Sequence, residues 1–194
     1  MAQTQMAFDT TRQQFFPFTC RPGITVRAVD SATVYAVTAA IANQVSTSSS
    51  DLGLMTDRPV PQGLRNSFQS HTEQFVFYDA EDKPIGWSIG QQKEADTFIM
   101  QWTGLVPAYQ NQGIYSAFLP RFLDYLRAIG YARVTSNHFV NNRAVLVAKL
   151  KAGFIATGMS LDERWGAILW LTHFLDENVE DAFRHAFSLE KYRS

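Results

Sequence analysis

Residues 106–120 read VPAYQNQGIYSAFLP, and this stretch joins a strand-like segment to a helix through a polar turn. The preceding segment, TFIMQWTGLV (97–106), has the composition of a buried strand. After the turn, apolar residues recur at helical spacing at positions 114, 118, 119, 122, 123, 126 and 129, and Gly130 closes the pattern. The sequence here predicts a strand, a turn with a single glycine, and an amphipathic helix.

A turn of this kind is suited to bind an anion. The first amides of a helix have no intrahelical partners, and the helix dipole adds partial positive charge there. We expect residues 110–116 to form a phosphate cradle, in which Gly113 lets the backbone approach a ligand and Ser116 adds a hydroxyl. The glycine patterns of Walker-type phosphate loops and of dinucleotide-binding folds are missing from the sequence.

The remaining segments predict an α/β (α+β) fold. Strands are expected at 24–29, 74–79, 84–92, 97–106 and 131–137, with a hairpin at 154–175. Helices are expected at 31–45, 62–71, 114–130, 141–154 and 177–192, with Asp30 or Ser31 capping the first and Asn141 or Asn142 capping the fourth. This order implies a mixed, mostly antiparallel central sheet of about six to seven strands with helices on both faces.

Composition limits the class of protein. The 194 residues suit a single domain spanning 1–194, and 46% hydrophobic with 18% charged residues is typical of a soluble globular chain. A net charge of -1 gives no field to attract nucleic acid or an anionic membrane, and one cysteine, Cys20, argues against a disulfide or a thiolate metal cluster. We therefore expect a cytoplasmic protein without metal, nucleic-acid or membrane partners. The strands of the last hairpin are compatible with a homodimer.

Two motifs resemble the GNAT superfamily of acetyl-coenzyme A-dependent N-acetyltransferases. The family pattern Gln/Arg-x-x-Gly-x-Gly/Ala after the fourth strand stands here as QNQGIY (110–115), preceded by VPAY (106–109). The second family motif is an asparagine at the start of a helix that ends in Gly-Phe, and here it reads NNRAVLVAKLKAGF (141–154). The resemblance covers about residues 24–174, which leaves 1–23 as an N-terminal extension and 175–194 as a C-terminal helix.

The resemblance implies a GNAT-like fold that transfers an acetyl group from acetyl-coenzyme A directly to a primary amine of a small molecule or peptide. The fourth and fifth strands would splay near 104–106 beside the thioester, the amides of 112–116 would hold the pyrophosphate, and Asn142 would bind the pantetheine. The implied coenzyme-binding residues are Leu105, Val106, Gln110, Asn111, Gln112, Gly113, Ile114, Tyr115, Ser116 and Asn142.

The chain departs from the family pattern at the residues that would do the chemistry. Tyr115 replaces the usual glycine or alanine, and the strand at 97–106 has no carboxylate to act as a base. The tyrosine that many members use as general acid has no equivalent, since Ala148 and Lys149 stand there. His138 is then the candidate base, and Tyr115 or Tyr109 the candidate acid.

Each of these candidates has an alternative interpretation. His138 also fits a hydrogen-bonded structural histidine, and Lys149 and Lys151 fit solvated lysines of a helix's last turn. Trp87, Trp102, Trp165 and Trp170 are expected mostly in the core. A non-catalytic acyl-coenzyme A-binding or sensor module and a nucleotide-phosphate binder are the alternative functions.

Overall fold

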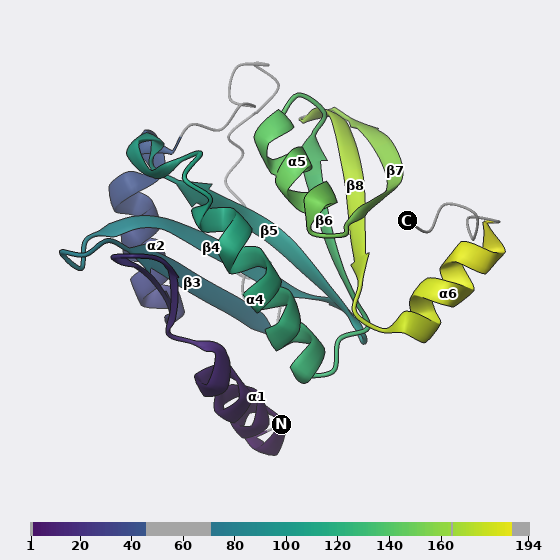
Figure 1. The fold of residues 1–194 in the computed structure, drawn as a ribbon, viewed down its shortest axis with the longest axis horizontal. Helices are drawn as coiled ribbons and strands as arrows, with labels where there is room; N and C mark the ends of the chain where they lie inside the picture. The colour runs from purple at the N-terminus through teal and green to yellow at the C-terminus, as the bar shows by residue number, and fades with distance from the viewer. Residues whose placement is uncertain (1, 46–70, 164, 188–194) are drawn as a thin grey trace.

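A single eight-stranded sheet forms the centre of the computed structural model, which describes residues 2–45, 71–163 and 165–187 (Figure 1). Its strand order is β1-β2-β3-β4-β5-β6-β8-β7, and only β5 and β6 pair in parallel within these residues. The prediction of a mixed, mostly antiparallel sheet is confirmed, with eight strands instead of six to seven. The strands are β1 (Phe18–Arg21), β2 (Ile24–Ala28), β3 (Thr72–Tyr78), β4 (Pro84–Glu94), β5 (Thr97–Leu105), β6 (Arg133–Phe139), β7 (Ile155–Asp162) and β8 (Gly166–Phe174).

Helices cover both faces of the sheet, as predicted. In Figure 1, α2 lies behind the sheet while α4 and α5 lie in front of it. None of the helices in the described segments is both long and apolar enough to cross a membrane. The helices are α1 (Ala2–Phe15), α2 (Ser31–Ile41), α4 (Ile114–Ala128), α5 (Arg143–Lys151) and α6 (Glu177–Ala186), with short 3-10 turns η1 (Ala42–Gln44) and η2 (Pro107–Tyr109).

Local capping signals placed the helix starts correctly. The Asp30 carboxylate accepts from the Thr33 amide, and the Asn142 side chain accepts from the Val145 amide, so these two residues are the caps of α2 and α5. The helix expected at 62–71 lies outside the described residues, apart from His71. Helix α1 was not predicted, because its pattern of apolar residues is weak.

Aromatic side chains bind α4 to the front of the sheet. Phe118 packs against Phe77 of β3 with ring centroids 5.1 Å apart, and Phe122 packs against Phe98 of β5 at 5.7 Å. All four rings are buried, so the apolar stripe of α4 is what fixes this helix on the sheet.

The tryptophans are not mostly in the core, and Trp102 is the clearest departure from that prediction. Trp87 is buried, whereas Trp102 is 65% exposed. The register between β4 and β5 shifts, because Ile89 lies opposite Trp102 while the next residue, Gly90, lies opposite Met100. This bulge at position 101 reverses the faces on which later side chains of β5 lie.

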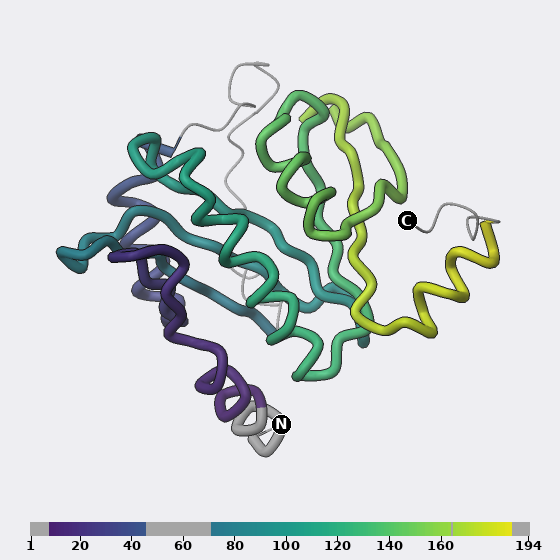
Figure 2. Tube along the Cα trace, in the orientation of Figure 1, coloured from purple at the N-terminus to yellow at the C-terminus, as the bar shows by residue number. Residues whose placement is uncertain are grey.

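The parallel strands β5 and β6 are paired only over their first halves. Their register runs from Thr97 opposite Arg133 to Met100 opposite Ser136. Beyond that point the two strands diverge, as the tube in Figure 2 shows. Strand β4 continues to accompany β5, and β8 continues to accompany β6, so the sheet opens between residues 101–105 and 137–139.

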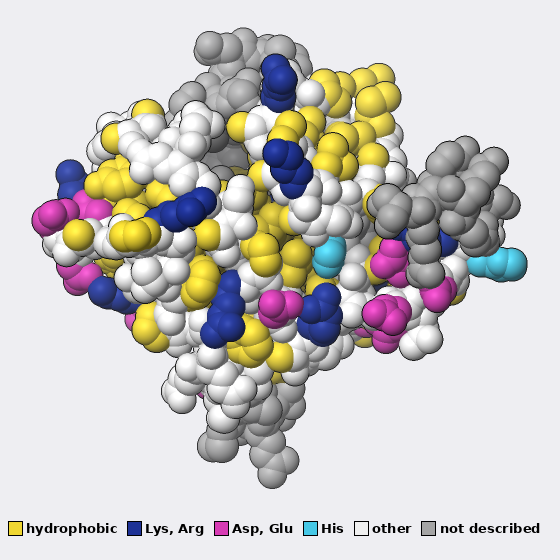
Figure 3. Space-filling model, viewed as in Figure 1, with side chains coloured by type: hydrophobic (Ala, Val, Ile, Leu, Met, Phe, Trp, Pro, Cys, Tyr) yellow, Lys and Arg dark blue, Asp and Glu magenta, His cyan; other side chains and the backbone are white. Residues whose placement is uncertain are grey.

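The far side of the sheet ends at β7, an edge strand with exposed apolar residues. Met159 and Leu161 of β7 and Val147 and Leu150 of α5 are exposed. Hydrophobic side chains gather over α5 and the β7–β8 hairpin in Figure 3. The homodimer expected from this hairpin remains a prediction.

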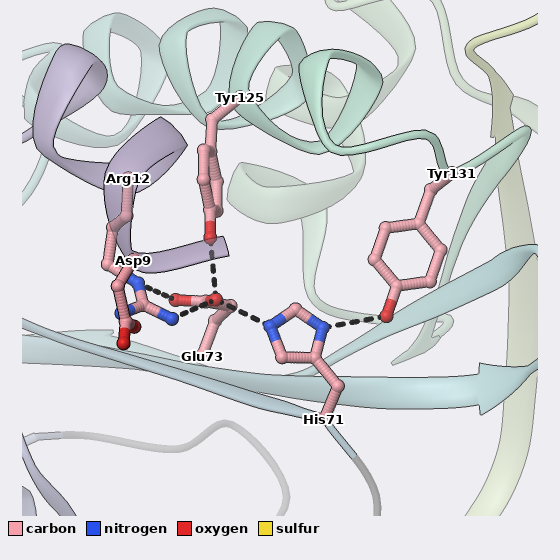
Figure 4. Close-up of polar contacts among 6 residues, drawn as sticks. All are labelled: Asp9, Arg12, His71, Glu73, Tyr125 and Tyr131. Carbon is pink, nitrogen blue, oxygen red and sulfur yellow. Dashed lines mark hydrogen bonds and ion pairs between the residues drawn. The ribbon is translucent and has the colours of Figure 1, made fainter. Parts of the chain in front are cut away.

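A buried carboxylate anchors α1 to the sheet and to α4. Glu73, which is 1% exposed, accepts two hydrogen bonds from the Arg12 guanidinium, at 2.8 and 2.7 Å (Figure 4). The Tyr125 hydroxyl donates to the same carboxylate at 2.6 Å. His71 lies between Glu73 and Tyr131, at 2.7 and 2.8 Å. Burial raises the pKa of Glu73, but the hydrogen bonds from His71, Arg12 and Tyr125 outweigh it and hold the pKa below its ordinary value.

We expect Glu73→Ala to lower the free energy of unfolding by about 3 to 5 kcal/mol, because it leaves Arg12 and the Tyr125 hydroxyl without their buried partner. Urea denaturation measures this change, and Glu81→Ala at an exposed turn should stay within about 0.5 kcal/mol of the wild type.

The contribution of Glu73 to the free energy of unfolding should change with pH in a defined direction. Because the folded pKa of Glu73 is depressed below its ordinary 4.5, its charge stabilises the fold above that pH and the benefit is lost as pH falls through the folded pKa. The difference between wild type and Glu73→Ala should therefore shrink in acid. A constant difference across pH would contradict this role for the carboxylate.

Candidate functional site

The opening between β5 and β6 exposes the backbone amide of Leu105. The Val106 amide donates to the Ile85 carbonyl at 2.9 Å, and Leu105 lies opposite Gly86. Backbone groups in an antiparallel ladder point to alternate sides, so the Leu105 amide points away from β4 and into the opening. This differs from the sequence expectation for Val106, whose amide is engaged by β4.

The polar turn after β5 is held by its own glutamines. Gln110 donates from its side chain to the Leu105 carbonyl at 2.7 Å, and Gln112 donates to the Ala108 carbonyl at 2.6 Å. Asn111 and Gly113 both have positive φ, at 59° and 73°. The two glutamine side chains therefore help to hold the turn in shape.

Helix α4 begins directly after this turn, and its first amides are free. The first hydrogen bond of α4 runs from the Ala117 amide to the Gly113 carbonyl at 3.0 Å. The amides of Ile114, Tyr115 and Ser116 consequently have no intrahelical acceptor. Gly113 itself is the residue before the helix, and its left-handed backbone is the conformation that glycine adopts without strain.

A cation that the sequence did not reveal lies at this turn. A methyl group added at Gly113 would collide with the guanidinium of Arg21. Arg21 is exposed and ends β1, a strand within the segment that the sequence suggested was only an extension. The site therefore combines three free amides with a positively charged side chain. The position of Arg21 depends on the long-range packing of β1 against α4, so no local sequence motif predicts it.

The two tyrosines proposed as acids lie in different surroundings. The Tyr115 ring is partly buried and packs 6.5 Å from the Phe118 ring, so it turns away from the helix N-terminus toward the interior. Burial raises its pKa, which keeps the hydroxyl protonated at neutral pH. Tyr109 instead donates from its hydroxyl to the Asp79 carboxylate at 3.0 Å.

His138 lies on β6 beside the opening. Its Nε2 is 3.0 Å from the Ser136 hydroxyl, which is fully buried. Burial, and secondarily the nearby charge of Lys149, lowers the pKa of His138 to about 3. The imidazole is therefore neutral at neutral pH and only weakly basic.

Lys149 is fully buried, which corrects one sequence expectation. Lys151 is exposed, as a solvated last-turn lysine should be, but Lys149 is not. The Lys149 ammonium nitrogen lies 2.8 Å from the sulfur of Met100 and 4.1 Å from the Phe154 ring centroid. Burial lowers its pKa well below the ordinary value of 10.5. Periodicity missed this residue because α5 has only a weak apolar stripe.

Asn142, the last of the predicted coenzyme-binding residues, lies at the start of α5. Asn142 caps α5, so its side-chain oxygen is occupied by the Val145 amide at 3.4 Å, and a role toward pantetheine stays a prediction. Among residues 2–45, 71–163 and 165–187, no three His, Cys, Asp or Glu side chains lie together as a metal site would require.

The fold matches solved N-acetyltransferases at low sequence identity. The ribosomal-protein alanine N-acetyltransferase from Escherichia coli aligns with a TM-score of 0.60 and 14% identity, over 79% of this chain and 94% of that one. Spermidine N-acetyltransferase from Vibrio cholerae, in complex with CoA and spermine, gives 0.58 and 16%, over 80% and 97%. YncA from Salmonella typhimurium, with its cofactor acetyl-CoA, gives 0.57 and 18%, over 80% and 95%.

These structures establish the fold, which is that of the GNAT N-acetyltransferases. No protein-family model and no curated protein sequence matches the chain.

We expect Gly113→Ala to lower the free energy of unfolding by about 1 kcal/mol, because alanine is strained at positive φ. The added methyl group would also displace the flexible Arg21 guanidinium. Chemical denaturation tests the stability change against Gly158→Ala, where a methyl group meets nothing within 4 Å. Equal stability of the two variants would show that the left-handed turn is not required.

Proposed function

We propose that this protein is an N-acetyltransferase that moves an acetyl group from acetyl-coenzyme A directly to a primary amine. One observation carries the proposal. A parallel strand pair opens after four residue pairs, and the N-terminus of α4 follows β5 across a short turn. An elongated ligand with a phosphate group at one end and a reactive group at the other fits this combination. The structural likeness to proteins solved with CoA or acetyl-CoA supports the same ligand class.

In this proposal the pyrophosphate binds at the α4 N-terminus. The amides of Ile114, Tyr115 and Ser116 would donate to its oxygens, and Arg21 would neutralise part of its charge. Gln110, Asn111, Gln112 and Gly113 would hold the turn in shape.

The pantetheine arm would then enter the opening between β5 and β6. There the Leu105 amide would donate to the thioester carbonyl and stabilise the negative charge that forms on its oxygen. The acceptor's neutral amine attacks the carbonyl carbon, a carbon–nitrogen bond forms, and the carbon–sulfur bond breaks. Because a thioester is already reactive, positioning and this amide supply much of the acceleration.

Cys20 supports direct transfer over a covalent intermediate. The thiol is buried, and burial raises the pKa of Cys20 to about 12. A thiol that stays protonated at neutral pH is a poor nucleophile.

We expect acetyl-coenzyme A to release free thiol when a reactive primary amine is added, at a rate well above the uncatalysed background. A panel of polyamines, amino acids and peptide N-termini, followed by a thiol-reactive dye, provides the measurement. Tight coenzyme binding without amine-stimulated thiol release across the panel would favour the alternative, a non-catalytic acyl-coenzyme A-binding module. Titration calorimetry with ATP in place of the coenzyme distinguishes the nucleotide-phosphate binder.

We expect Arg21→Gln to weaken coenzyme A binding about 5-fold to 50-fold, because it removes one charge-assisted contact to phosphate. The loss should be larger at low salt, since salt screens an exposed charge pair. Calorimetry at two salt concentrations measures both effects. Arg127→Gln, at the opposite end of α4, is the matched control and should bind as the wild type does. Equal affinities for wild type and Arg21→Gln would remove Arg21 from the site.

A further inference from the structure

The buried amine of Lys149 is unusual in having no anionic partner. Lysine is almost never fully buried unless it is paired. Within the described part of the chain, Lys149 forms no ion pair with a carboxylate; its nitrogen donates to the Met100 sulfur and lies over the face of Phe154. An apolar side chain of similar length would fill this space without the cost of burying an amine. Perturbed groups of this kind concentrate at functional sites.

The Lys149 amine lies at the closed end of the opening, where the pairing of β5 with β6 stops. Met100 and Ser136 are the last residues that pair β5 with β6, and the Lys149 nitrogen lies against the Met100 sulfur. On its other side, the nitrogen lies 6.0 Å from the ring centroid of Tyr115, in the first turn of α4. A coenzyme arm that runs from that turn toward the closed end of the opening would therefore approach the amine.

The groups that face Lys149 are otherwise uncharged at neutral pH. Tyr115 of α4 keeps its proton, and His138 of β6 and His173 of β8 are neutral because burial lowers the pKa of each. Lys149 lowers both histidine pKa values further, so protonation of all three is disfavoured. The charge of this pocket is consequently set by the protonation of Lys149.

We propose that Lys149 is the proton donor to the departing coenzyme A thiolate, an assignment that rests on the proposed acetyl transfer. As the carbon–sulfur bond breaks, the ammonium nitrogen of Lys149 releases a proton to the sulfur and becomes a neutral amine. The acceptor's nitrogen, which becomes positively charged in forming the amide, loses its own proton to solvent. Lys149 regains a proton from solvent after the product thiol leaves, so one proton is transferred to sulfur in each turnover.

The chemistry of the pocket suits this donor. Burial favours the neutral amine that proton release produces, and a thiolate forming beside the ammonium draws the proton toward the sulfur. Because burial lowers the pKa of Lys149, its ammonium gives up a proton to the sulfur more readily than an exposed lysine would. Neither Tyr115, with its raised pKa, nor neutral His138 offers the leaving group so acidic a proton without first being charged at some cost.

The decisive variant is Lys149→Met, which keeps an unbranched chain but removes the proton. We expect kcat for acetyl transfer to fall about 100-fold to 10,000-fold, the usual contribution of a general acid. The dissociation constant for acetyl-coenzyme A, measured by calorimetry, should change less than about 3-fold. Thermal unfolding should occur at no lower temperature than in the wild type, because an uncompensated buried amine has been removed. Lys151→Met, on the exposed side of the same helix, should leave kcat unchanged.

The pH profile separates proton donation from a packing role. In the wild type, kcat at saturating acceptor should fall on the alkaline side as Lys149 loses its proton, and this limb should be absent in Lys149→Met. A Lys149→Met enzyme that keeps wild-type kcat, or that keeps the alkaline limb, would overturn the proposal.

A binding measurement tests the assignment independently of turnover. Coenzyme A and desulfo-coenzyme A are titrated into wild type and Lys149→Met from about pH 6 to about pH 11, which brackets the ordinary pKa values of thiol and lysine. The thiol itself titrates in this range with both proteins, but its thiolate form should bind more tightly to the wild type than to Lys149→Met, because only the wild type offers an ammonium beside the sulfur. If the wild type releases no thiol with any amine, the proposed function fails, yet such a sulfur-dependent difference would still place Lys149 against the sulfur. Identical behaviour of the two proteins overturns that placement.

Discussion

The early end of the parallel pairing between β5 and β6 determines how the rest of the molecule is arranged. A parallel pair normally continues as long as both strands do, because each further residue adds ladder hydrogen bonds. Here β5 follows β4 to Leu105, while β6 follows β8 to Phe139, and the two antiparallel parts of the sheet diverge after Met100 and Ser136. The opening is thus maintained by stronger pairing on both outer sides. A ligand that enters it meets backbone groups that have no partner in the sheet.

The phosphate end of the site depends on a segment far away in the sequence. Arg12 in α1 is fixed by Glu73, and Arg121 of α4 donates to the backbone carbonyls of Gln14 and Phe15 at the end of the same helix. Strand β1 begins shortly after α1 and carries Arg21 to the N-terminus of α4. The buried carboxylate network is therefore one of the constraints that position a cation at the opposite end of α4. A segment that reads as an extension is part of the sheet and of the candidate site.

The sequence predicted those parts of the fold that local chemistry decides. The cap signals at residues 30–31 and 141–142 and the glycine at 113 each act within a few residues, so they can be recognised in a short window of sequence. Strand β1, the exposure of Trp102 and the position of Arg21 depend on contacts between distant segments. Trp102 is instructive, because one bulged residue reverses an alternation that is otherwise correct.

Lys149 shows why a residue's chemistry cannot be inferred from its place in a helix alone. In sequence it stands two residues from Lys151, near the C-terminal end of α5, where lysine is favoured by the helix dipole. The two side chains differ by about half a turn around the helix axis, so one faces solvent and the other faces Met100. The same residue type is a surface charge at 151 and a desolvated amine at 149. His138 and Tyr115 share that interior and carry no charge at neutral pH. The electrostatics of the opening therefore follow from a single side chain.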